Sequence, residues 1–158
     1  MPDTPPAAAP PMSPGTYIMK RREAAGLSLD DVAARVGGDA AARADLRANL
    51  RRFEAGDPGE YSGLIYQQLP GVFPFDRRVL AALVIAASNP AKVLPPICRV
   101  CACSDFDPCV DRTGPCGWTP PVPGKQPLCT ACPADEPDPS AQLPIPAAAN
   151  EGEARHAA

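Results

Sequence analysis

The chain has 158 residues, of which 23 are proline and 12 are glycine, whereas only one Trp, three Tyr and four Phe are present. This composition excludes a single large hydrophobic core that runs from end to end, because proline-rich segments with few aromatic residues bury too little apolar surface to fold. The formal net charge of −3 excludes binding to polyanions through the overall charge, so any nucleic-acid contact must depend on a local group of basic residues.

The two ends of the chain are Pro/Ala-rich and are predicted to be disordered tails, over residues 1–12 and 134–158, the second of which is acidic. The start of the sequence lacks the basic residues and apolar run of a secretory signal. No segment has the roughly 20 apolar residues that a membrane-spanning helix needs. We therefore expect a soluble cytoplasmic protein without a membrane partner.

Five short helices are predicted between the tails, over residues 14–25, 29–36, 40–55, 61–69 and 77–88. Ser13, Ser28 and Asp76 carry the side-chain oxygens that cap helix N-termini, and glycines end the first two helices. In the third and fifth helices, apolar residues recur every three or four positions, as on helices that pack against a core. The prediction is a mainly α fold, with an all-α domain over residues 13–88 and a linker over residues 89–96.

The third predicted helix carries a row of basic side chains. Arg43, Arg47 and Arg51 are four residues apart, and Asn49 lies among them. Guanidinium groups bind phosphates and guanine edges, and asparagine amides bind adenine edges. Basic residues also outnumber acidic ones between residues 20 and 52. These four residues are predicted to bind double-stranded DNA, and the alternative is a solvated arginine face paired with nearby carboxylates.

All seven cysteines lie between residues 98 and 132. Two Cys-x2-Cys pairs, Cys98 with Cys101 and Cys129 with Cys132, have the spacing of structural zinc sites, in which each pair presents two thiolates to one tetrahedral ion. Residues 97–133 are therefore predicted to form a zinc-knuckle module. Its few apolar residues cannot hold a fold without the metal.

Three cysteines remain as a second set of candidate ligands, Cys103, Cys109 and Cys116. One of the aspartates in this segment (Asp105, Asp107 or Asp111) could supply a fourth ligand, or one thiolate could bridge two metals. Iron–sulfur ligation is the competing chemistry. No paired carboxylates, phosphate-binding loop or nucleophile–base pattern indicates an enzyme, and the single histidine, His156, lies in the acidic tail.

The helical segment, residues 13–88, resembles the Cro and λ-repressor-like helix-turn-helix family of the XRE type. The run from Ile18 to Gly37 contains the family's Gly-Leu-Ser turn and a small residue, Ala33, four positions before a glycine. The run LRRFEAG at residues 50–56 resembles the end of the recognition helix. The resemblance implies a small five-helix DNA-binding domain.

The same resemblance implies an ion pair between Arg22 and Glu54. The chain departs from the family at Leu29, where DNA-binding relatives usually carry glutamine. It also has more residues than the family pattern between Gly37 and Leu50. The recognition helix must therefore start later, extend backwards or follow a longer loop.

The cysteine-rich segment resembles a segment of uncharacterised phage and prophage proteins, in which Cys-x2-Cys-Gly-Cys precedes Cys-x-Trp and Cys-x2-Cys. Ala102 stands in place of that glycine. Together the resemblances predict a prophage-type transcriptional regulator that binds DNA and contains a structural zinc module. The alternatives are a protein-interaction adaptor that uses both parts without DNA, and an iron–sulfur or redox protein. A partner protein and a homodimer both stay open.

Overall fold

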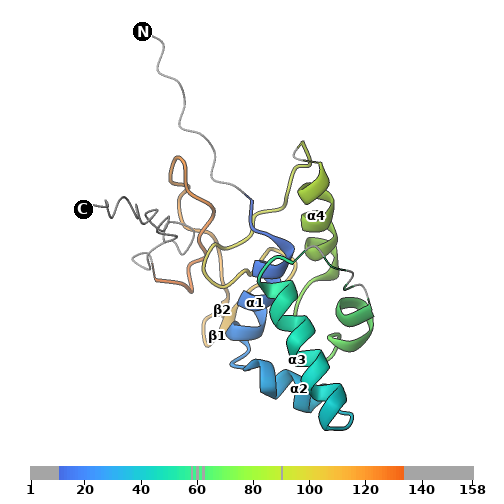
Figure 1. Cartoon of the computed structure of the whole chain (residues 1–158). Helices are drawn as coiled ribbons and strands as arrows, with labels where there is room; N and C mark the ends of the chain where they lie inside the picture. The colour runs from blue at the N-terminus through green and yellow to red at the C-terminus, as the bar shows by residue number, and fades with distance from the viewer. Residues whose placement is uncertain (1–10, 58, 60, 62, 90, 134–158) are drawn as a thin grey trace, which may run out of the picture.

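The computed structural model describes residues 11–57, 59, 61, 63–89 and 91–133. The tail predicted over residues 134–158, with His156, lies outside the described residues, as does all of the tail predicted over residues 1–12 except Pro11 and Met12. Within the described part, helices come first and a small two-stranded sheet follows (Figure 1). None of the helices in this part is long and apolar enough to cross a membrane.

The described residues contain five helices, as predicted: α1 Pro14–Ala24, α2 Leu29–Val36, α3 Ala40–Glu54, the π-helix η1 Leu64–Gln68 and α4 Arg77–Ser88. The mainly helical fold class is therefore confirmed. The predicted caps are also present: the Ser13 hydroxyl accepts from the Thr16 amide at 3.0 Å, and the Asp76 carboxylate accepts from the Arg78 amide at 2.7 Å. Ser28 and Asp31 form a reciprocal capping box at the start of α2.

The turn between α2 and α3 is short. Val36 ends α2 and Ala40 begins α3, so only Gly37, Gly38 and Asp39 connect the two helices. Both glycines have positive φ, at 89° and 94°, a conformation that residues with a Cβ rarely adopt. Because α3 then runs without interruption from Ala40 to Glu54, the residues between Asp39 and Leu50 are helical and do not form a long loop.

The hydrophobic core contains side chains from all four α-helices and from η1. Tyr17, Ile18, Leu50 and Leu80 are fully buried in it. The Tyr17 hydroxyl accepts from the Asp76 amide at 2.9 Å and so joins α1 to the beginning of α4. Burial raises the pKa of Tyr17 to about 12.

Two helices approach each other closely at Gly15 on α1. A Cβ at this position would lie 2.1 Å from the Phe53 carbonyl oxygen on α3, which is far inside van der Waals contact. Glycine is therefore required here because the two backbones meet, and α1 is seated directly on the end of α3.

The cysteine-rich segment contains little regular structure. A short antiparallel hairpin, β1 Val110–Asp111 and β2 Gly114–Pro115, pairs Val110 with Pro115 and Asp111 with Gly114. The rest of the segment is held by single bridges, such as that between Trp118 and Cys129.

The cysteine-rich segment packs against the helices. Ile97 and Ala102 belong to the same buried cluster as the helical core. Lys20 on α1 donates to the Val100 carbonyl at 3.2 Å, and Arg21 on α1 forms an ion pair with Asp107. The two parts of the chain thus share an interface along α1.

That interface continues at α4. The Arg78 guanidinium lies 4.2 Å from the centre of the Phe106 ring, a cation–π contact. Both the first helix and the last helix of the helical part therefore contact the cysteine-rich segment.

Candidate metal centre

The first Cys-x2-Cys pair lies on a tight turn. The Ala102 amide donates to the Cys98 carbonyl, and the Cys98 amide donates to the Cys103 carbonyl, both at 2.9 Å. Ala102 closes this turn with φ of 59°, the left-handed region that favours glycine.

The second pair lies on a turn that is tied to the first. The Cys132 amide donates to the Cys129 carbonyl at 3.2 Å, and the Arg99 amide donates to the Pro127 carbonyl at 2.9 Å. The Cys129 amide also points to the Cys98 sulfur at 3.4 Å. Backbone hydrogen bonds therefore bring the two knuckles together, although a long segment separates them in sequence.

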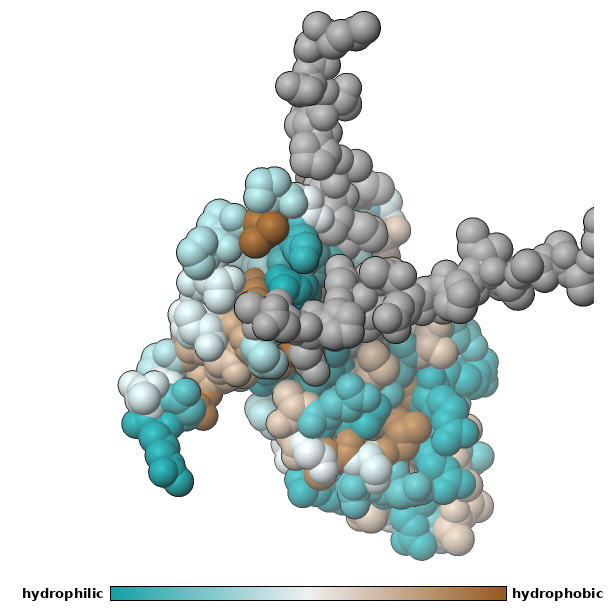
Figure 2. All heavy atoms as spheres, turned by 90° about the vertical axis from the view of Figure 1, so that its left-hand side faces the viewer, coloured by the Kyte–Doolittle hydropathy of each residue, from teal (hydrophilic) through white to brown (hydrophobic). Residues whose placement is uncertain are grey.

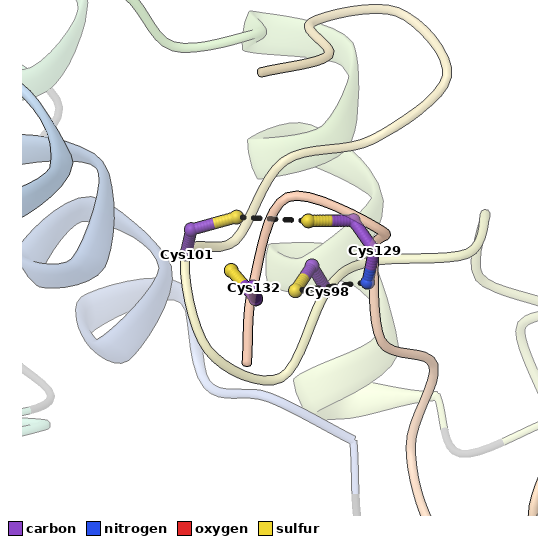
Figure 3. A group of neighbouring side chains, drawn as sticks. All are labelled: Cys98, Cys101, Cys129 and Cys132. Atoms are coloured by element: carbon purple, nitrogen blue, oxygen red, sulfur yellow. Dashed lines mark hydrogen bonds between the residues drawn. The ribbon is translucent and has the colours of Figure 1, made fainter. Parts of the chain in front are cut away.

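The four sulfurs of the predicted zinc site face one another (Figure 3). Those of Cys98, Cys101, Cys129 and Cys132 all lie within 4.8 Å of one another. The Cys101 and Cys129 sulfurs are 3.7 Å apart. A tetrahedral ion with metal–sulfur bonds of about 2.3 Å requires sulfurs about 3.8 Å apart. These residues are therefore close enough to bind a metal ion, and all seven cysteines are free of disulfide bonds.

A second group of four cysteines overlaps the first. Cys101, Cys103, Cys109 and Cys129 also have sulfurs within 4.8 Å of one another, and Cys101 and Cys109 are 3.4 Å apart. Of the predicted second set, Cys103 and Cys109 therefore join two members of the first set. Cys116 lies 3.7 Å from Cys103 but belongs to neither group.

The three aspartates that could have completed the second set have other partners. Asp105 accepts from the Trp118 indole at 2.7 Å, Asp107 pairs with Arg21, and Asp111 accepts from the Thr113 amide at 2.7 Å. The structure thus favours thiolates over carboxylates as the fourth ligand. The sequence could not show this, because the aspartates and the cysteines alternate along the chain.

The close packing of the thiols affects their pKa values, and a bound cation would oppose this effect. Burial raises the pKa of the Cys109 and Cys132 thiols, and the neighbouring Cys101 thiol raises the pKa of Cys103. By contrast, hydrogen bonds from the thiols of Cys101 and Cys103 to the Cys98 thiolate lower the pKa of Cys98. Closely packed thiols cannot all ionise together without a positive charge among them, whereas a divalent metal displaces their protons.

The geometry also bears on the kind of metal. Sulfurs in each group are close enough for four of them to surround a single ion, as in a closed structural zinc site. An iron–sulfur cube instead places each thiolate on a different iron, with sulfides between them, and needs more widely separated sulfurs. The arrangement therefore suits direct tetrahedral ligation of an ion by thiolates alone.

The four residues predicted to bind DNA all lie on α3. Arg47 donates to Asp30 on α2 at 2.6 Å, and Arg43 donates to the Gly38 carbonyl at 2.7 Å. Arg51 and Asn49 are exposed. With 3.6 residues per turn, Asn49 lies about 200° around the helix from Arg47. The helix thus places the three arginines along one flank and Asn49 on another.

Arg22 and Glu54 are in contact, as the family resemblance implies. Arg22 donates from Nε and Nη2 to the two oxygens of Glu54, each at 2.7 Å, and from Nη1 to the Leu27 carbonyl at 2.7 Å. The hydrogen bond to Glu54 raises the pKa of Arg22. This ion pair fixes the end of α3 to α1 and to the turn before α2.

Comparisons with known proteins add no neighbour to these observations: no protein-family model, no curated protein and no solved structure matches the chain.

Proposed function

We propose that this protein is a DNA-binding transcriptional regulator, in which α2 and α3 form a helix-turn-helix unit and the cysteine-rich segment is a structural zinc module. The observation that carries the proposal is the row of three arginines on α3, Arg43, Arg47 and Arg51, which begins directly after a three-residue turn. Turns of this length, often with glycine, join the two helices of helix-turn-helix units.

The arginine row keeps donors available for phosphate. Arg43 uses one donor on the Gly38 carbonyl, and a guanidinium has five N–H groups. The side chains of Arg47 and Asp30 are 43% and 74% exposed, so their ion pair is weak and can be exchanged for a phosphate contact. Arg51 is exposed one turn further along. The three side chains thus form a short basic stripe beside α2.

The metal module has a supporting role in this proposal. It contacts α1 through Lys20 and Arg21 and α4 through Arg78. These helices form the core on which α3 packs. A folded module therefore stabilises the scaffold that presents α3, without itself touching DNA.

Binding of a short DNA duplex, followed by fluorescence anisotropy at several salt concentrations, tests the proposal. We expect affinity to fall steeply with salt, because arginines that contact phosphates release counterions. Arg47→Ala and Arg51→Ala should each lower the magnitude of the log–log slope by about 1. Arg112→Ala, which removes the same charge from the turn of the β1–β2 hairpin, should leave the slope unchanged.

Asp30 supplies a test in the opposite direction. Because its carboxylate competes with phosphate for Arg47, Asp30→Asn should raise the affinity for DNA. If the unmodified protein does not bind duplex DNA even at low salt, the proposal is wrong.

A protein-interaction adaptor is the second candidate. It is favoured by exposed apolar side chains, among them Phe106, Val110 and Val122, which are 53%, 76% and 52% exposed. On the side of the molecule that Figure 2 shows, however, the most hydrophobic residues are separated by hydrophilic ones. An adaptor would bind its partner equally well after Arg47→Ala and Arg51→Ala, but not after Cys98→Ser, which distinguishes it from the DNA-binding regulator.

A further inference from the structure

The two groups of cysteines share two members. Cys101 and Cys129 belong both to the group with Cys98 and Cys132 and to the group with Cys103 and Cys109. Two separate tetrathiolate sites would need eight cysteines, whereas the chain has seven. The geometry is thus unsuited to two independent metal sites, but it matches two sites that share an edge.

We propose that the cysteine cluster binds two divalent metal ions of the zinc type, bridged by the thiolates of Cys101 and Cys129. Cys98 and Cys132 complete the tetrahedron of the first ion, and Cys103 and Cys109 complete that of the second. Six thiolates then satisfy two four-coordinate ions. The proposal does not depend on DNA binding.

The sulfur separations support the shared edge. The two bridging sulfurs are 3.7 Å apart, and Cys109 lies 3.4 Å from the bridging Cys101. Both values are close to the edge of a tetrahedron with metal–sulfur bonds of about 2.3 Å. Two ions that share this edge of 3.7 Å, with bonds of about 2.3 Å, would lie about 2.7 Å apart, and slightly further apart if the bridging bonds are longer.

Charge also favours two ions over one. A single dication in the first group would leave Cys103 and Cys109 as thiols in a crowded, partly buried cluster, next to a metal–tetrathiolate unit with a net charge of −2. A second dication converts them to ligands and releases their protons. The complete cluster of six thiolates and two dications also carries a net charge of −2. The second ion therefore allows two more thiols to ionise while the net charge of the cluster stays at −2.

Cys116 is left outside both tetrahedra. Its sulfur lies 3.7 Å from that of Cys103, but Cys116 does not lie close enough to all the sulfurs of either group to be a member of it. Its replacement should therefore leave the metal content unchanged. This residue provides a matched control, because Cys116→Ser removes one thiol from the same cluster as Cys109→Ser does.

Native mass spectrometry of the full-length protein, loaded with Zn²⁺, measures the number of ions for each chain. We expect two ions in the unmodified protein, two in Cys116→Ser and one in Cys109→Ser. A single ion in the unmodified protein at saturating zinc would overturn the proposal, as would retention of two ions by Cys109→Ser. Far-UV circular dichroism of each variant checks that the helices remain folded.

X-ray absorption spectroscopy of the two-zinc protein tests the bridge without any substitution. We expect sulfur-only first shells and a zinc–zinc scattering path at about 2.7 Å or slightly longer. Two bound zinc ions without this path would show separate sites and overturn the shared edge. Failure of DNA binding changes neither result, so the two proposals can fail independently.

Discussion

The buried ion pair between Arg22 and Glu54 leads to a quantitative prediction about stability. The two side chains are 9% and 7% exposed, and both of their hydrogen bonds are 2.7 Å long. Glu54→Ala removes both acceptors and leaves the guanidinium with the Leu27 carbonyl and one distant contact to Glu23 at 3.5 Å. The variant thus contains a buried cation that has lost its buried carboxylate and keeps only the exposed carboxylate of Glu23.

Removal of one partner from a buried ion pair costs about 3–5 kcal/mol. In a domain of roughly 60–100 residues, each kcal/mol lowers Tm by about 4–8 °C. We therefore expect Glu54→Ala to lower the Tm of the metal-loaded protein by at least about 12 °C. Thermal unfolding followed by circular dichroism at the helical band measures this shift.

Two comparisons test whether burial is the cause. Arg47→Ala breaks an exposed ion pair on the same helix and should leave Tm nearly unchanged. A double variant, Arg22→Met with Glu54→Leu, should recover much of the loss, because no buried charge remains. If Glu54→Ala and Arg47→Ala unfold at the same temperature, the reasoning from burial is refuted.

Three further predictions concern the helix contact, the α4 cap and the metal. Gly15→Ala should destabilise the protein by about 1–3 kcal/mol in urea unfolding, since the added Cβ would lie 2.1 Å from the Phe53 carbonyl oxygen. Gly63→Ala is the control and should be tolerated, because a Cβ at this position has no neighbouring atom within 4 Å. The hydrogen bond from the Arg78 guanidinium lowers the pKa of Asp76. The stability that ionised Asp76 contributes is therefore present above the unfolded pKa of about 3.9 and is lost as pH falls through the lower folded pKa. Unfolding curves of Asp76→Asn should accordingly show a shallower loss of stability below about pH 4. Zinc affinity, measured by competition with a chelator, should fall as pH falls, because protons compete with the metal for thiolates; an affinity independent of pH would contradict thiolate ligation.

The helices could be predicted closely from the sequence because their ends carry local signals. Capping side chains at Ser13, Ser28 and Asp76 and the glycines after α1 and α2 mark boundaries that depend on neighbouring residues alone. The residue pattern predicts a third helix that starts at Ala40, where α3 does start, whereas the family resemblance leaves open whether the recognition helix starts later, extends backwards or follows a longer loop. High helix propensity of alanine was the signal that could have decided it.

The metal centre could be predicted only in part. Spacing identified the two Cys-x2-Cys pairs, because each pair forms its own local turn. The sharing of Cys101 and Cys129 with a second group depends on where the loop that carries Cys109 folds back. Such long-range placement leaves no pattern in the sequence.

The contact between the two parts of the chain was missed for the same reason. The ion pair between Arg21 and Asp107 and the contact of Arg78 with Phe106 join residues that are far apart along the chain. An expected linker suggested separate domains, whereas Ile97 packs into the helical core. In the sequence, Arg21, Arg78 and Asp107 are indistinguishable from ordinary surface residues.

We expect metal bound by the cysteine cluster to fold residues 97–133 against α1. Hydrogen–deuterium exchange of the full-length protein with and without zinc tests it most directly. On removal of the metal we predict that the amides of Cys98, Arg99 and Ala102, which donate to backbone carbonyls within the segment, lose their protection, while α3 keeps much of its own. Equal protection of these amides in the metal-free and zinc-loaded protein would contradict the account.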